Sequence, residues 1–280
     1  MLGKLIKHEF RATGRLMAPL FGALVLLALV VRANDLVFQH VESHSAFLNI
    51  LNTLLIIAYV LALFGVMVFS TVLMIKRFHQ NFLTDEGYLM FTLPTSVHSL
   101  LWSKLITAAL FFIFTFLAEA LSVAIVVWRG GLAREMFTGF ADFFRRLDSY
   151  YMANGLAFAL ETLALLFVSL LVTCLLFYAP MSIGYSFANH KGLLSVVFYF
   201  VIQAILQIFG VAVLSGAVND TAFHRLLTDA MDNLGRIDTP VTAMQAAHGT
   251  MLLALFTELF LGAILYFLTY FMLRKHRNLQ

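Results

Sequence analysis

The sequence predicts an all-α polytopic membrane protein, on the evidence of its composition and of its long apolar runs. Of its 280 residues, 61% are hydrophobic and only 12% are charged, whereas an ordinary soluble domain has about 25% charged residues. A soluble core has no room for so much apolar sequence, but a membrane-spanning helix needs roughly 20 apolar residues in a row. Both observations therefore favour a chain that crosses the bilayer several times.

Six apolar runs are long enough to cross a hydrocarbon core that is about 30 Å thick. They cover residues 16–33, 46–75, 105–128, 154–187, 193–218 and 249–273. We expect each run to be a helix of a single transmembrane domain that spans residues 1–280. No internal repeat is visible in the sequence, so nothing in it supports an inverted-repeat transporter.

The first 15 residues carry an amphipathic helical pattern ahead of the first run. Its apolar face holds Leu2, Leu5, Ile6 and Phe10, and its basic face holds Lys4, Lys7, Arg11 and Arg15. The pattern predicts an interfacial helix over residues 1–15, with its bases toward anionic lipid headgroups. A signal peptide is the alternative, but this basic start is too long and too amphipathic for one.

The basic residues predict the orientation of the chain. If both termini lie inside, every lysine falls in an inner segment, and the outer segments carry only arginines. Because cytoplasmic loops are enriched in basic residues, we expect both termini in the cytoplasm. Outside, we expect an interfacial helix within residues 129–153 and a small polar cap within residues 219–248.

Residues 76–104, KRFHQNFLTDEGYLMFTLPTSVHSLLWSK, form the longest polar interruption on the expected cytoplasmic side. Lys76, Arg77 and Lys104 are placed to anchor its ends at the lipid headgroups. Its aromatic residues are typical anchors at a protein interface. Pro94 fixes the chain just before the third span, where its missing N–H does little harm. The segment is therefore predicted to dock a separate soluble partner.

No catalytic motif accompanies the spans. The only Gly-Lys pair, Gly3-Lys4, lacks the upstream glycine of a phosphate-binding loop. No histidine lies in the middle of a predicted span, so no metal site is expected. Cys174 falls in an apolar run and is expected only to be buried. We expect no enzyme activity, no cofactor or metal in this chain, and no nucleic-acid partner.

Three carboxylates interrupt the apolar runs: Glu119, Glu161 and Glu258. A charged side chain inside a membrane is costly, so these groups are expected to face the bundle interior or water. Counted from the span ends, all three lie roughly 10–14 Å below the outer face, which predicts one shared polar layer. Two interpretations stay open, a substrate or proton path and interhelical hydrogen bonds to residues such as Gln203 and Gln207.

The layout and the residues of the docking segment together resemble the permease (transmembrane) subunits of ATP-binding-cassette (ABC) transporters, in the type-2 exporter family. Residues 85–96, DEGYLMFTLPTS, with Lys104, are similar to a pattern DEGYLxFTLPxS…K that many bacterial members carry in this loop. The layout covers the whole chain, whereas the motif covers only residues 76–105.

The resemblance implies a cytoplasmic coupling helix between the second and third spans, which docks a separate ATPase subunit that binds ATP and Mg²⁺. It also implies that residues 1–15 are the connecting helix, and that a second copy or a sister permease completes a dimer in a bacterial inner or plasma membrane. The residues expected at the ATPase contact are Arg77, Phe78, Phe82, Asp85, Glu86, Tyr88, Phe91 and Pro94.

Two other functions stay open at this point. A proton- or ion-coupled carrier would use Glu119, Glu161 and Glu258. An integral-membrane enzyme acting on lipid or peptide would need a nucleophile or a metal cluster, and the sequence has neither at membrane depth. The chain also lacks a nucleotide-binding domain and a large outer domain, which leaves the substrate open.

Overall fold

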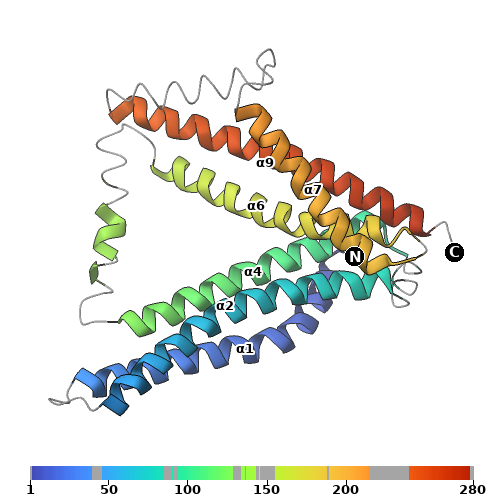
Figure 1. Ribbon diagram of the computed structural model, residues 1–280. Coiled ribbons are helices and arrows are strands. Elements are labelled where there is room, and N and C mark those ends of the chain that lie inside the picture. Colours follow the sequence, from blue (N-terminus) through green and yellow to red (C-terminus); the bar gives the residue numbers. More distant parts are fainter. Residues whose placement is uncertain are drawn as a thin grey trace. The chain divides into compact units, whose positions relative to one another are not determined.

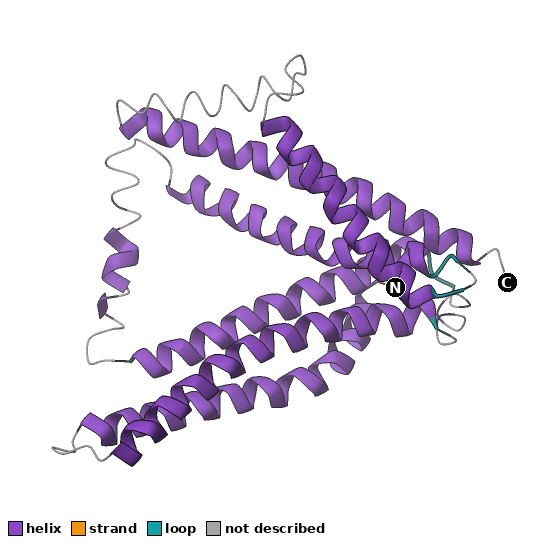
Figure 2. Cartoon of the chain, in the orientation of Figure 1, coloured by secondary structure: helices purple, strands orange, loops and turns teal. Residues whose placement is uncertain are grey.

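The computed structural model describes residues 2–39, 46–84, 87, 90, 92, 94–128, 134–135, 137–142, 145, 155–187, 189–214 and 240–277. All regular structure within these residues is helical (Figure 2). The long helices are α1 (Leu2–Gln39), α2 (Ala46–Leu83), α4 (Val97–Val127), α6 (Gly155–Gly184), α7 (Lys191–Leu214) and α9 (Pro240–Arg277) (Figure 1). These six are long and apolar enough to cross a membrane, so the predicted all-α polytopic class is confirmed.

The N-terminal amphipathic segment is part of the first long helix. Residues 1–15 were expected to lie apart from span 16–33, but α1 runs through both, with Pro19 inside it. The buried residues of α1 follow one stripe along its length: Glu9, Thr13, Met17, Leu24, Ala28 and Val31. Their spacing keeps them on one side of a helix. The expected boundary at residue 15 is therefore not a helix end, because the same face stays packed on both sides of it.

The helices on either side of the docking segment also extend beyond their apolar runs. α2 continues to Leu83, and α4 begins at Val97 rather than at residue 105. Ser96 caps α4, since its hydroxyl oxygen accepts the backbone N–H of Ser99 at 3.3 Å. Only a short stretch of chain therefore separates the two helices.

The structure describes only part of the outer elements that the sequence predicts. The described residues between 134 and 145 are helical and exposed. Residues 219–239 of the expected polar cap lie outside the described residues. From Pro240 onward the expected cap belongs to α9, which begins nine residues before the predicted last span.

The chain divides into two compact units, Met1–Leu132 and Ala133–Gln280. In the first unit α1 packs closely on α4, and α2 packs on both. In the second unit α6 is the central helix, which packs on α7 and on α9. In the first unit, α1 and α4 run parallel to each other and antiparallel to α2. In the second unit, α6 and α9 run parallel to each other and antiparallel to α7 (Figure 1).

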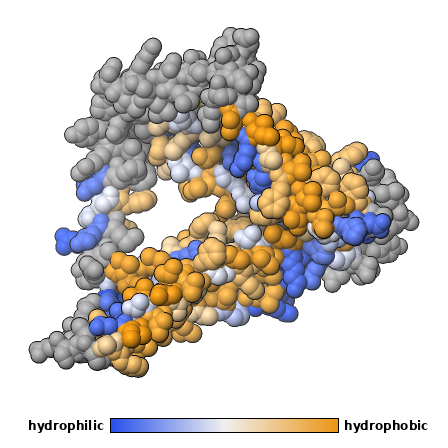
Figure 3. Space-filling model, in the orientation of Figure 1, coloured by the Kyte–Doolittle hydropathy of each residue, from blue (hydrophilic) through white to orange (hydrophobic). Residues whose placement is uncertain are grey.

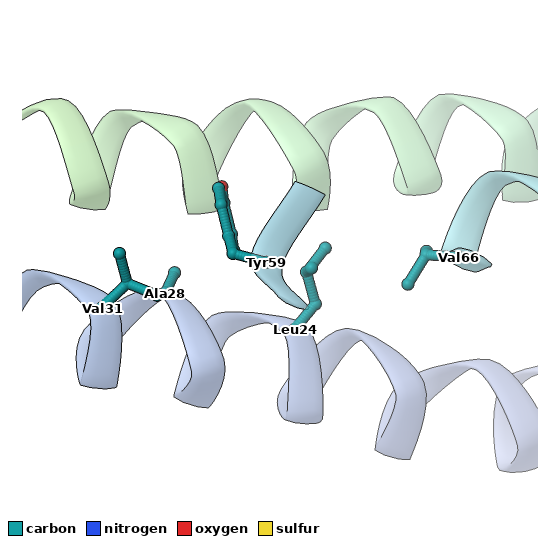
Figure 4. Packing of buried hydrophobic residues seen from close by; sticks show 5 residues of the cluster. All are labelled: Leu24, Ala28, Val31, Tyr59 and Val66. Carbon is teal, nitrogen blue, oxygen red and sulfur yellow. The ribbon is translucent and has the colours of Figure 1, made fainter. Parts of the chain in front are cut away.

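The core of the first unit combines apolar packing with buried hydroxyl groups. Leu24, Ala28 and Val31 of α1 pack with Tyr59 and Val66 of α2 (Figure 4). Inside a bilayer, close packing and interhelical hydrogen bonds hold helices together, because lipid is as apolar as the side chains. This core therefore depends on the fit of its side chains and on the bonds between its helices.

Two hydroxyl pairs join α2 to α4. The Tyr59 and Ser122 hydroxyl oxygens are 2.9 Å apart, and those of Ser70 and Thr115 are 3.0 Å apart. Ser122 donates its only hydroxyl hydrogen to the carbonyl oxygen of Glu119 at 2.8 Å. Because that hydrogen is committed, Tyr59 is the donor to Ser122.

Small residues allow close approach in the second unit. A Cβ atom at Gly262 of α9 would lie 3.0 Å from a methyl group of Val172 in α6. A Cβ atom at Gly184, at the end of α6, would collide with the backbone nitrogen of Ser195 in α7. Small residues let backbones approach in this way in membrane bundles.

The outward faces of the helices are largely apolar, as lipid or a further protein surface requires. Large apolar side chains such as Phe64, Phe200 and Phe260 are more than 60% exposed. Apolar colour covers most of the described helices in the view of Figure 3. These faces agree with the membrane environment that the composition predicts.

The Tyr59–Ser122 bond predicts a measurable coupling between α2 and α4. In a double-mutant cycle of Tyr59→Phe and Ser122→Ala, we expect a coupling energy of about 0.5–1.7 kcal/mol, the range typical of interhelical bonds in membranes. Unfolding in a denaturing-detergent titration measures it. Thr173→Ala is the control, because among the described residues that exposed hydroxyl bonds to its own helix alone. Strictly additive effects of the two substitutions would contradict the bond.

Candidate functional site

A buried ion pair joins α1 to α4 at the end of the first unit nearest the docking segment. The Lys104 ammonium group contacts the Glu9 carboxylate, and both side chains are almost fully buried. Asn81 of α2 donates its side-chain N–H to the same Glu9 oxygen at 3.4 Å. Arg77, one turn earlier in α2, donates to the carbonyl oxygen of Ala12 at 2.8 Å. We call these five residues the Glu9 cluster.

The Glu9 cluster corrects the expected place of Lys104. This lysine was predicted to anchor the third span at the headgroups, but it is only 3% exposed. A lysine is stable in such a place only with a counter-charge, and Glu9 supplies one from a different helix. Removing one partner of a buried pair typically costs about 3–5 kcal/mol, because the other charge is left uncompensated.

Phe78 and Phe82 also lie elsewhere than expected. Both were predicted to contact an ATPase, but they are 0% and 1% exposed, and their ring centres are 5.1 Å apart. They continue a buried row that repeats every fourth residue from Ser70 through Met74. Because α2 stays helical to Leu83, that row faces the interior, and these two rings are part of the packing of the unit.

The middle of the docking segment is partly described. The N–H of Gly87 donates to the carbonyl oxygen of Thr84 at 2.8 Å. A Cβ atom on Gly87 would lie 2.8 Å from the carbonyl oxygen of Phe82, so a larger residue would force this turn to open. Pro94 is exposed just before the cap of α4. The other expected contact residues lie outside the described residues: Asp85, Glu86, Tyr88 and Phe91.

Glu161 has a histidine partner that the sequence did not reveal. His248 Nδ1 of α9 lies 2.6 Å from Glu161 Oε2 of α6, and both side chains are about 25% exposed. The imidazole also meets the ring of Phe158 edge-on, with 5.9 Å between the ring centres. His248 was not a candidate because the last span was expected to begin at residue 249, whereas it lies well inside α9. A histidine–carboxylate pair of this kind can exchange a proton.

Glu258 lies at a different level of the interface between α6 and α9 that also holds Glu161 and His248. Its carboxyl group lies close to Ser169 of α6, and its Oε2 is buried without a hydrogen-bond partner among the described residues. Ser169 follows Glu161 by eight residues, or about 12 Å along the helix. Glu161 and Glu258 therefore do not share one layer, because the depth of Glu258 was counted from residue 249 and not from the true start of α9.

Glu119 belongs to the first unit, in α4. Its Oε1 is buried and has no hydrogen-bond partner among the described residues. At Glu161 the hydrogen-bond partner is His248, and not the expected Gln203 or Gln207. Within the described ranges, no three His, Cys, Asp or Glu side chains gather closely enough to hold a metal ion.

Comparisons with protein-family models, with characterised proteins and with solved structures find no match for this chain. The interpretation of the Glu9 cluster and of the three carboxylates therefore depends on their own geometry and chemistry. The strongest feature of that geometry is the Glu9 cluster, because it unites residues from three helices at a buried charge.

We predict that Lys104→Met lowers the free energy of unfolding by about 3–5 kcal/mol, because it leaves the Glu9 carboxylate buried without a cation. The double variant Glu9→Gln with Lys104→Met should regain most of that loss. Lys76→Met is the matched control, because Lys76 is exposed on α2 and its loss should cost less than about 0.5 kcal/mol. Equal stability of the two single lysine variants would show that the ion pair contributes nothing.

Proposed function

We propose that this chain is the membrane-spanning permease subunit of an ATP-driven exporter of the ABC type. It forms a substrate path and docks a separate ATPase subunit through residues 76–104. The observation that best supports this proposal is the Glu9 cluster, which ties α1 to both helices that border that segment. A segment that transmits force must be held rigidly at its two ends, and buried charge-assisted bonds provide such a hold.

Each end of the docking segment has its own link to α1. On the α2 side, Arg77 and Asn81 bond to Ala12 and Glu9. On the α4 side, Lys104 pairs with Glu9. A displacement of the segment by a partner therefore moves α1, α2 and α4 together at this end. Packed helices respond to such a push as rigid bodies, which is what coupling ATP hydrolysis to a membrane path requires.

The partner contact falls to the middle of the segment, since Phe78 and Phe82 are buried. Of the other expected contact residues there, Pro94 is exposed, and Asp85, Glu86, Tyr88 and Phe91 lie outside the described residues. Two adjacent carboxylates and two aromatic rings suit a partner groove with basic and apolar parts. ATP and Mg²⁺ belong to the partner, so the chain itself is not an enzyme.

The proposed assembly is a dimer of this chain with itself or with a sister permease, together with two ATPase subunits. It lies in a bacterial inner or plasma membrane with both termini in the cytoplasm. This orientation puts the docking segment and the Glu9 cluster on the side where ATP is available. The distribution of lysines supports it.

A proton- or ion-coupled carrier is the second candidate, favoured by the Glu161–His248 contact at 2.6 Å. Ionisable pairs inside a membrane often form proton relays. Such a carrier, as expected from the sequence, would use Glu119, Glu161 and Glu258 and would need no ATPase. The two candidates differ in their energy source, which an experiment can separate.

The docking prediction is tested by purifying the tagged chain in mild detergent after co-expression with its neighbouring genes. We expect an ATPase subunit to co-purify with the wild type. With Asp85→Ala/Glu86→Ala its retention should fall at least about tenfold, equal to about 1.4 kcal/mol of binding, because the carboxylates that fit the partner are gone. The amount of ATPase bound per chain and its hydrolysis rate are the measurements.

Glu135→Ala/Asp142→Ala is the matched control, since it removes two exposed carboxylates outside the docking segment and should leave retention unchanged. If no ATPase binds the wild type, the permease proposal fails. Transport driven by a proton gradient without ATP, and abolished by Glu161→Gln, would establish the carrier instead.

A further inference from the structure

A groove runs between α2 and α4 on the side of the first unit. Its volume is about 520 Å³, within the range of roughly 300–1,000 Å³ that is typical of small-molecule sites. Among the described residues, its walls are apolar apart from one carboxylate, Glu119. The apolar lining residues include Val60, Leu63, Phe64, Met67, Phe116 and Val123. We call this feature the Glu119 groove.

The hydroxyl pair of Tyr59 and Ser122 does not satisfy the Glu119 carboxylate. Tyr59 donates to Ser122, and Ser122 donates to the backbone carbonyl oxygen of Glu119. No hydroxyl hydrogen of this pair is left for the carboxylate, whose buried Oε1 has no hydrogen-bond partner among the described residues. A carboxylate in an apolar run of a membrane protein is costly unless a cation or a donor accompanies it. The described residues that line the groove supply no positive charge for it.

The side chains that line the groove indicate the other chemical property that its occupant needs. Val60, Phe64 and Phe116 are about half exposed or more, so they offer apolar contact area without being filled by the unit's own core. Aromatic rings also attract cations through their faces. An occupant that matches both features has one positive charge on a bulky apolar body.

We propose that the Glu119 groove binds an amphipathic organic cation, with the positive charge beside Glu119 and the apolar body against α2 and α4. The site takes one such molecule from the membrane. That this molecule is the transported cargo rests on the proposed export function, but its binding to the groove does not. Charge complementarity selects a cation over a neutral or anionic molecule of equal size.

Tetraphenylphosphonium and tetraphenylborate are suitable probes, since they share size and apolar surface but carry opposite charges. Equilibrium dialysis against the full chain in nanodiscs of zwitterionic lipid measures their binding. We expect saturable binding of one tetraphenylphosphonium per chain and no saturable binding of tetraphenylborate. Glu119→Gln should weaken cation binding at least about tenfold, as expected when a buried charge partner is removed.

Two further variants separate the groove from general partitioning. Ala120→Trp, which fills the groove but keeps Glu119, should also weaken cation binding at least about tenfold by exclusion of the probe. Glu135→Gln, an exposed carboxylate elsewhere, should leave binding unchanged. Equal binding of the two ions, or equal binding of the cation by wild type and Glu119→Gln, would overturn the proposal.

The same site can be tested for a competing occupant. In a Cys174→Ala background, the thiol introduced by Ala120→Cys should react with a membrane-permeant maleimide, and tetraphenylphosphonium should protect it. A thiol that reacts equally fast with and without tetraphenylphosphonium would mean that the cation does not occupy the groove, as when a second copy or another part of the chain covers it, and would overturn the proposal. Cation binding without any ATPase contact would refute only the export function, whereas ATPase contact without cation binding would refute only this site.

Discussion

The buried contact between Glu9 and Lys104 is the constraint on which the arrangement of the first unit depends. Each charge alone would be too costly to bury, so each residue is tolerated only because a different helix supplies its partner. The pair thereby fixes the position of α1 against α4, and Asn81 adds α2 to the same point. Lipid competes equally well for apolar faces, so this buried pair adds a contact between α1 and α4 that lipid cannot replace.

Much of the fold follows from the sequence because hydrophobic length is a strong signal. The six long apolar runs predict six helices, and the structure has them. Their ends were harder to predict. α2 and α4 continue into polar sequence because one face stays buried, as at Phe78 and Phe82. α9 begins at Pro240, in sequence too polar to be counted as a span. A window of mean hydropathy does not detect a helix with one buried face.

The candidate sites were less predictable because they depend on which helices become neighbours. Glu119, Glu161 and Glu258 were evident as carboxylates in apolar sequence, but their depths and partners were not. Glu9 and His248 were missed. A signal for Glu9 did exist, since Glu9 is the only carboxylate before Asp35 and Lys104 is the only lysine or arginine between Arg77 and Arg129. An isolated acid and an isolated base at matching ends of two parallel helices are candidates for a pair.

The central claim is that the Glu9–Lys104 pair holds the beginning of α1 against the helices that border the docking segment. Amide hydrogen exchange of the full chain in nanodiscs tests it most directly, with Lys104→Met compared with Lys76→Met. We predict that Lys104→Met removes protection from residues 2–18 of α1 and leaves α6 and α9 unchanged, since local opening follows the loss of local contacts. Unchanged protection in α1, or an equal loss in both units, would contradict the claim.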